Sequence, residues 1–184
     1  EFNPHAINNR LERYFWFEKG DLVKGFNTYK RQKLSKVLFK SLEDKYTQKL
    51  EDIINANSPL VLASWGPGDE IRFSPLYSLL FKSNVSITFT CEPRLYKLLS
   101  QRYPALKFIS VKRSRRLNII DAEKYNQLPH SSLHHLMDNF LLNELHKFDK
   151  VTLLNDICSE LIEDHIQSLQ TLDFRILKSS ISPF

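Results

Sequence analysis

The fold is decided by residues 60–111, which read LVLASWGPGDEIRFSPLYSLLFKSNVSITFTCEPRLYKLLSQRYPALKFISV. Short apolar runs at 60–64, 85–90 and 107–111 have the length and composition of buried strands. Helical spacing of apolar side chains fills 69–82 and the stretch that begins at Pro93. Strand–helix alternation of this kind predicts an α/β fold with a doubly wound, mainly parallel, Rossmann-like sheet. Right-handed crossovers then place the loops after the strands along one edge, where such folds bind ligands.

The sequence before this stretch predicts helices. Gly20-Asp21 lies between two runs of helical spacing and indicates the turn of a helical hairpin, with Asp21 capping the second helix. A third helix is expected over 41–54, with Ser41 at its N-cap. We therefore expect an N-terminal helical segment over residues 1–57, a tetratricopeptide-like hairpin plus a linker helix, and a Rossmann-like domain over 58–184.

The sequence after this stretch predicts a return to β–α alternation. A polar loop is expected at 112–129, followed by a helix that starts at Ser131 or Ser132 and reaches Lys147. The remaining expected elements are a strand at 150–154, a helix at 158–169 and a strand at 174–177.

Composition limits the class of protein. The chain has 184 residues, 42% hydrophobic and 26% charged, which is typical of a folded domain. No apolar run approaches the roughly 20 residues that span a bilayer, no signal peptide is visible, and two cysteines are too few for a disulfide framework. These features predict a cytoplasmic protein. The chain begins Glu1-Phe2-Asn3 without Met, as an internal piece of a longer protein would.

The net charge of +5 has its densest cluster in Lys112-Arg113-Ser114-Arg115-Arg116. Such runs are more often solvated loops than nucleic-acid sites. The sequence shows no broad basic stripe and no known nucleic-acid module, so we do not expect a nucleic-acid partner.

Two of the four glycines flank the first strand-to-helix turn, Trp65-Gly66-Pro67-Gly68-Asp69-Glu70. Glycines there permit positive φ and close approach of a ligand, and a helix N-terminus offers free N–H groups. The turn lacks the spacing of the dinucleotide fingerprint and the Lys-Ser/Thr pair of a Walker loop. Asp69 and Glu70 would repel a phosphate. The turn therefore favours a neutral polar ligand, or a reaction that needs a carboxylate base.

Three motifs occur in a fixed order: Gly66-x-Gly68-Asp69-Glu70, Cys91-Glu92-Pro93-Arg94-Leu95 and Tyr103-Pro104. In this order they resemble the N-terminal Rossmann-like half of bacterial glycosyltransferases of the heptosyltransferase class. The stretch is more similar still to the glycosyltransferase-like domains that follow tetratricopeptide repeats. Residues 19–32, KGDLVKGFNTYKRQ, resemble the closing helical hairpin of that architecture, whereas residues 112–184 match only in the order of elements.

The resemblance implies a GT-B glycosyltransferase, in which two Rossmann-like halves face a cleft. The N-terminal half binds a sugar or glycan acceptor, and a C-terminal half, missing here, binds the nucleotide-sugar donor. Asp69 matches the proposed catalytic base of the family. Glu70, Arg72 and Arg94 complete the expected substrate-binding set with the two glycines of the first turn. We expect no cofactor and no metal site, and we expect the isolated chain to transfer no sugar.

Other interpretations remain open for these residues. Asp69 could simply cap its helix, Glu70 could favour the helix dipole, and Arg94 could be solvated. The whole chain could be a non-catalytic protein-interaction domain that uses its N-terminal helices. The aromatic side chains involved would either form a docking surface or pack the helices onto the sheet; they are Tyr14, Phe15, Trp16 and Phe17.

The histidines and cysteines favour structural roles. His134 and Asp138 are spaced as neighbours on one helix face, but a third metal ligand is not identifiable. Surface or half-buried histidines and buried, structural Cys91 and Cys158 are the expectation.

Overall fold

A computed structural model describes residues 9–63, 66–81, 86–113, 133 and 135–165. Its sheet has four strands in the order β3-β2-β1-β4, and every neighbouring pair is parallel. The strands are β1 (Pro59–Leu62), β2 (Thr88–Cys91), β3 (Lys107–Ser110) and β4 (Lys150–Leu153). The predicted parallel α/β sheet is confirmed, and all four of these strands overlap the expected ranges. The strand expected at 174–177 lies outside the described residues.

The helix expected at 69–82 is broken. It consists of α5 (Pro67–Phe73), a 3₁₀ turn (Ser74–Leu76) and α6 (Tyr77–Phe81). Pro75 has no N–H to donate and its ring crowds the preceding turn, so a continuous helix is disfavoured there. The Ser74 hydroxyl instead donates to the Ile71 carbonyl at 2.8 Å. Pro93 begins a 3₁₀ turn that leads into α7 (Tyr96–Arg102), as expected.

The N-terminal hairpin is confirmed. Helix α1 (Asn9–Glu18) turns at Gly20, whose φ of +74° is left-handed, into α2 (Leu22–Asn27). The Asp21 carboxylate caps α2 by accepting the Lys24 N–H at 3.0 Å. Gly25 lies against the Phe17 ring, and a Cβ there would come within 2.2 Å of a ring carbon. Glycine is therefore what allows the two helices to approach so closely.

The single helix expected over 41–54 is wrong. Ser41 lies near the end of α3 (Lys33–Leu42), a 3₁₀ turn follows, and α4 spans only Leu50–Ile54. Between them Tyr46 forms a parallel bridge with Val151 of β4, and the Thr47 N–H donates to the Val151 carbonyl at 2.9 Å. Pairing with the sheet therefore overrides the helical pattern of this segment.

The elements around β4 also differ from expectation. The helix expected to reach Lys147 from Ser131 or Ser132 is wrong as one element, because Asp138 caps a shorter helix, α9 (Asn139–Glu144). Helix α10 (Leu154–Asp164) starts directly after β4, four residues earlier than expected. Residues 166–169 of that expected helix, and most of the expected loop 112–129, lie outside the described residues.

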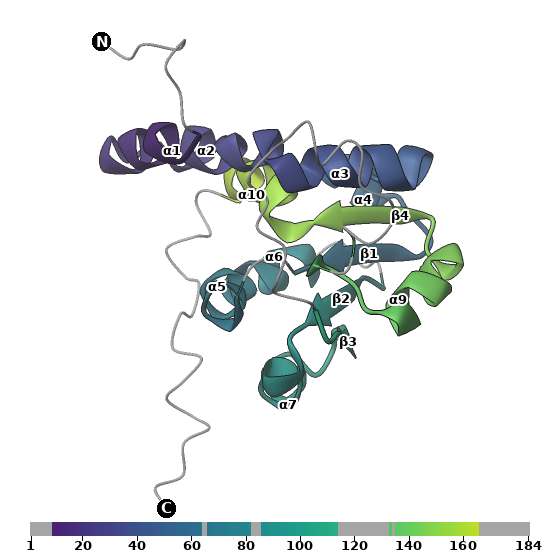
Figure 1. The fold of residues 1–184 in the computed structure, drawn as a ribbon. Helices are drawn as coiled ribbons and strands as arrows, with labels where there is room; N and C mark the ends of the chain where they lie inside the picture. The colour runs from purple at the N-terminus through teal and green to yellow at the C-terminus, as the bar shows by residue number, and fades with distance from the viewer. Residues whose placement is uncertain (1–8, 64–65, 82–85, 114–132, 134, 166–184) are drawn as a thin grey trace, which may run out of the picture.

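Side chains alternate across the sheet into two cores. Val61, Phe89 and Cys91 pack on one face with α2, α4, α5, α6, α7 and α10. Leu60, Leu62 and Val151 pack on the other with α3 and α9. Helices cover both faces, with α1, α2 and α3 in a row beside β4 and α10 (Figure 1).

The N-terminal helices contribute to both cores, with Tyr29 and Ile53 in one and Val37 and Leu38 in the other. The division between 1–57 and 58–184 stays a prediction. None of the described helices is long and apolar enough to cross a membrane.

Candidate functional site

The residues expected to form the site follow the carboxyl ends of β1 and β2. Gly66 to Arg72 belong to the α5 segment after β1, and Arg94 lies in the 3₁₀ turn after β2. The structure joins these two segments through Glu70, whose carboxylate accepts the Glu92 backbone N–H at 2.8 Å. The predicted site residues therefore share one edge of the sheet.

The two glycines of the turn do not have the positive φ that we expected. Gly66 has φ −96° and ψ 170°, an extended conformation that any residue adopts, and it is the N-cap of α5. A Cβ built on Gly66 or Gly68 would meet nothing within 4 Å. The Asp69 and Glu70 amides both donate to the Gly66 carbonyl, at 3.0 and 3.2 Å. The expectation that these N–H groups are free to bind a ligand is therefore wrong. Any ligand at this edge of the sheet would therefore be bound by side chains and not by these backbone N–H groups.

Asp69 presents an accessible carboxylate. Its side chain is 37% exposed, and an oxygen lies 3.5 Å from a guanidinium nitrogen of Arg72. Helix α5 has no side-chain cap, so Asp69 does not cap its own helix. Arg72 also donates to the Tyr29 hydroxyl at 3.3 Å and lies over the Phe73 ring. These contacts direct Arg72 along the α5 surface while most of its side chain stays in solvent.

Glu70, in contrast, is buried and paired. Its carboxylate forms an ion pair with Arg113, and the two side chains are only 1% and 5% exposed respectively. Arg113 also donates to the Ala63 carbonyl at 3.0 Å. In this conformation Glu70 faces protein groups and no open surface.

The interpretation of residues 112–116 as a solvated loop is wrong for Arg113. Val111 is fully buried, Lys112 is exposed, and the Arg113 side chain turns inward again, so burial alternates in the residues directly after β3. Alternation in the sequence separates Arg113 from Lys112 and Arg116 but not from Arg115, so the sequence does not single out Arg113.

Arg94 forms a two-point contact with the Glu92 carboxylate. Its Nε lies 2.6 Å from one oxygen and its terminal nitrogen 2.7 Å from the other. The hydrogen bonds and the charge of Glu92 raise the pKa of Arg94, which stays charged. About two thirds of the Arg94 side chain is exposed.

Three carboxylate–guanidinium pairs therefore line the ends of β1, β2 and β3: Asp69 with Arg72, Glu70 with Arg113, and Glu92 with Arg94. The pair between Glu70 and Arg113 is buried, whereas the other two expose their guanidinium groups. The exposed pairs supply both hydrogen-bond donors and acceptors, and within each pair the opposite charges cancel. Such an arrangement suits a neutral ligand rich in hydroxyl groups better than a phosphate.

The cysteines are buried thiols, as expected. Burial raises the pKa of Cys91 to about 12 and that of Cys158 well above its usual range. Asp138 is used as the cap of α9, and His134 lies outside the described residues. Among the residues that the structure describes, no group of three potential ligands could bind a metal ion.

A second buried carboxylate, Asp156, was not anticipated from the sequence. It lies in the first turn of α10 and is fully buried. The Ser35 hydroxyl lies 2.8 and 3.0 Å from its two oxygens, and the Tyr46 hydroxyl also donates to it. Burial raises the pKa of Asp156 to about 6, although these hydroxyl donors act in the opposite direction. An acidic residue in the first turn of a helix is normally expected to be exposed, so the sequence gives no sign that Asp156 is buried.

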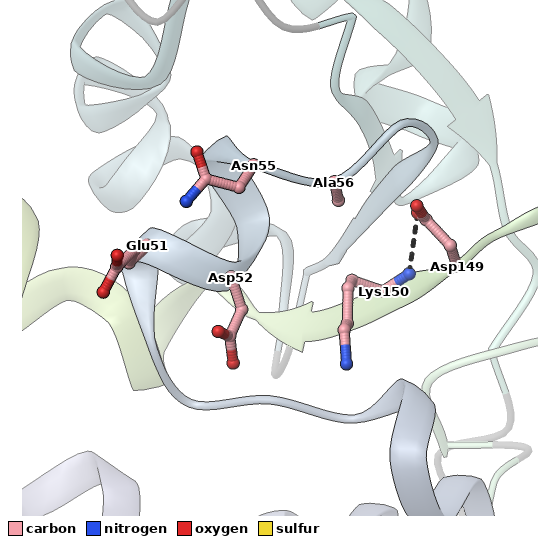
Figure 2. A pocket seen from close by; sticks show the side chains of 6 residues that line it. All are labelled: Glu51, Asp52, Asn55, Ala56, Asp149 and Lys150. Carbon is pink, nitrogen blue, oxygen red and sulfur yellow. Dashed lines mark hydrogen bonds between the residues drawn. The ribbon is translucent and has the colours of Figure 1, made fainter.

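An open pocket of about 360 Å³ lies at the opposite, amino-terminal edge of the sheet. Figure 2 shows residues that line it: Glu51 and Asp52 of α4, Asn55 directly after that helix, and Asp149 and Lys150 at the start of β4. Partial burial of Asp149 is outweighed by backbone N–H donors from Asn57 and Ser58, which lower its pKa. These contacts tie the chain before β1 to the start of β4, so we assign this edge a structural role.

Comparisons of the chain with protein-family models, with curated proteins and with solved structures found no match.

Proposed function

We propose that this chain is the acceptor-binding half of a bacterial, nucleotide-sugar-dependent glycosyltransferase of the GT-B type. One observation carries the proposal: Asp69 presents a 37% exposed carboxylate beside the exposed Arg72, at the sheet edge where α/β folds bind ligands, and does not cap its own helix. The two free cysteine thiols agree with a reducing cytoplasm.

Asp69 acts as the general base in this proposal. It takes the proton of an acceptor hydroxyl, and the hydroxyl oxygen forms a bond to the anomeric carbon of the donor sugar. The bond between that carbon and the nucleoside diphosphate breaks, and the diphosphate leaves with its electron pair on the donor half. Arg72 and Arg94 hydrogen-bond other acceptor hydroxyls, since both expose their guanidinium groups.

Acceptor binding is the direct test on this chain. Saturation-transfer NMR with a panel of mono- and oligosaccharides should show binding that weakens in Asp69→Asn. Asp164→Asn, an exposed acid at the end of α10, is the matched control and should bind as the wild type does. Calorimetry with nucleotide-sugars should show no saturable binding at micromolar concentration. Saturable donor binding would instead assign this chain to the donor half.

Turnover in the full-length protein tests the role of the base. Loss of a general base costs about 10²–10⁴-fold in rate. Asp69→Asn should therefore reduce turnover by that factor while leaving the thermal midpoint unchanged, because Asp69 is half-exposed and caps nothing. Unchanged turnover would make Asp69 a surface residue and would remove the basis of the proposal.

A second candidate is a non-catalytic interaction domain that uses the N-terminal helices. The observation in its favour is the exposure of Leu11 and Tyr14, 65% and 50%, one turn apart on α1. Phe17 does not belong to that surface, because its ring packs against Gly25 and Phe26. A downstream α/β half able to bind a nucleotide-sugar in the full-length protein supports the enzyme, and its absence supports the interaction domain.

A further inference from the structure

We propose that Arg113 and Glu70 are positioning residues, which fix the turn containing Asp69 relative to the ends of all three neighbouring strands. This inference rests on the proposed function for the meaning of Asp69, but its structural content can be tested without any ligand. Neither residue touches the acceptor in this scheme.

The contacts converge on one ion pair. The Glu70 carboxylate accepts from the Glu92 N–H, just past β2, and pairs with Arg113, just past β3. Arg113 reaches back to the Ala63 carbonyl, just past β1, at 3.0 Å. The Ala63 N–H in turn donates to the Thr90 hydroxyl at 2.8 Å. Removal of this pair would therefore remove the contacts by which Glu70 connects the α5 turn to the ends of β2 and β3.

Asp69 is adjacent to Glu70 in the first turn of α5, so the orientation of one follows the other. Among the described residues, Asp69 forms its ion pair with Arg72, which lies on the same helix and moves with it. The position of the Asp69 carboxylate relative to β2 and to Arg94 is therefore set through Glu70. A catalytic base loses much of its effect when it is displaced by about 1 Å, so such a constraint has a functional purpose.

The burial of this ion pair indicates that it contributes more to the position of the α5 turn than to the free energy of unfolding. Both side chains are almost completely buried, and desolvation of two charges offsets most of their attraction. Replacement of both members by neutral groups of similar size is often nearly neutral for stability. An ion pair at this buried place therefore adds little net stability. The guanidinium group of Arg113 can, however, contact Ala63 and Glu70 at the same time, which holds the two segments together.

The test compares Arg113→Lys and the double variant Glu70→Met/Arg113→Met, which removes both the ion pair and the acceptor of the Glu92 N–H, with Lys112→Met, which replaces an exposed cation one residue away. Amide hydrogen exchange is measured in the first turn of α5 and at Glu92, with the β1 amides as internal reference. Both test variants should speed exchange at α5 and Glu92 by at least about tenfold, while β1 protection and the thermal midpoint change little. Lys112→Met should alter none of these rates.

Two outcomes overturn the inference. Either α5 and Glu92 keep their protection in the double variant, or exchange rises equally in β1, which would indicate a purely stabilising pair. The same variants are then titrated with any saccharide that binds the wild type, and weaker binding with intact β1 protection is expected. If no saccharide binds the wild type, the proposed function fails, while the exchange result still decides whether the pair positions the turn.

Discussion

Two of the carboxylates that the fold buries, Glu70 and Asp156, are stabilised by different means. Glu70 is paired with a guanidinium and a backbone N–H at the ends of β1, β2 and β3. Asp156 receives hydroxyl donors from Ser35 and Tyr46 between α3, α10 and the edge of β4. An arginine brings a full opposite charge, whereas hydroxyl groups bring only dipoles. This difference predicts that the stability contributed by Glu70 depends on its partner Arg113, whereas the stability contributed by Asp156 depends on pH.

The largest effect is expected from Arg113→Met alone. This change leaves the Glu70 charge buried without its cation, and breaking a buried pair in this way costs about 3–5 kcal/mol of unfolding free energy. Urea denaturation at neutral pH measures it, with Lys112→Met as the control of similar chemistry on the exposed side of the same segment. A loss no larger than that of the control would show that Glu70 does not need Arg113.

The pH dependence of stability should identify Asp156. Its folded pKa of about 6 lies above the reference value of 3.8, so the folded state binds the proton more tightly than the unfolded state. The stabilising contribution is complete below about pH 4 and is lost as the pH rises through 6, by up to about 3 kcal/mol.

Denaturation of wild type and Asp156→Asn between pH 4 and 7 measures this contribution as the difference between the two curves. The wild type should lose stability relative to the variant as the pH rises. Parallel curves would show that Asp156 titrates normally in the fold.

Tyr46→Phe should have an intermediate effect that itself depends on pH. The change removes one hydroxyl donor to Asp156 and keeps the aromatic ring, which packs edge-on against Phe39. A hydrogen bond to a charged group contributes about 1.5–3 kcal/mol, so the loss should be greatest above pH 6, where Asp156 is ionised. An equal loss at pH 4 and pH 7 would indicate that the ring, and not the hydroxyl group, supports this region.

Arg94→Met should have the smallest effect on stability. Arg94 pairs with Glu92 through two nitrogen atoms, but its side chain is 66% exposed and solvent screens the attraction. Thermal melts should show no shift outside experimental error, although saccharide binding should weaken under the proposed function. A clear fall in the melting temperature would mean that exposure does not separate the two arginines.

The sequence predicts the parts of this fold that depend on local pattern. The apolar runs at 60–64 and 107–111 form β1 and β3, and the Gly20-Asp21 signal predicts the turn between α1 and α2. The prediction over 41–54 is wrong because Tyr46 pairs with Val151, far along the chain, and helical periodicity contains no information about that contact.

The same limit applies to the candidate site. Gly66 to Arg72 and Arg94 could be placed at one sheet edge from topology alone. The partners of Glu70 could not, because Arg113 lies within a basic run whose other members look identical in sequence. Asp156 was missed for a related reason, since its burial depends on Ser35 and Tyr46 from distant segments.

The bridge between Tyr46 and Val151 covers part of an edge strand of the sheet, β4. An exposed edge strand offers unpaired backbone groups to other chains and is a common starting point for aggregation. At β4 the Val151 carbonyl is already engaged by the Thr47 N–H, and the Lys150 ammonium donates to the Asp44 carbonyl alongside. At β3, the other outer strand of the described sheet, Lys107 is exposed and places a charge where a foreign strand would pair. Within the described sheet, one outer strand is therefore paired with the chain itself, and the other carries a charge that disfavours pairing with a second chain.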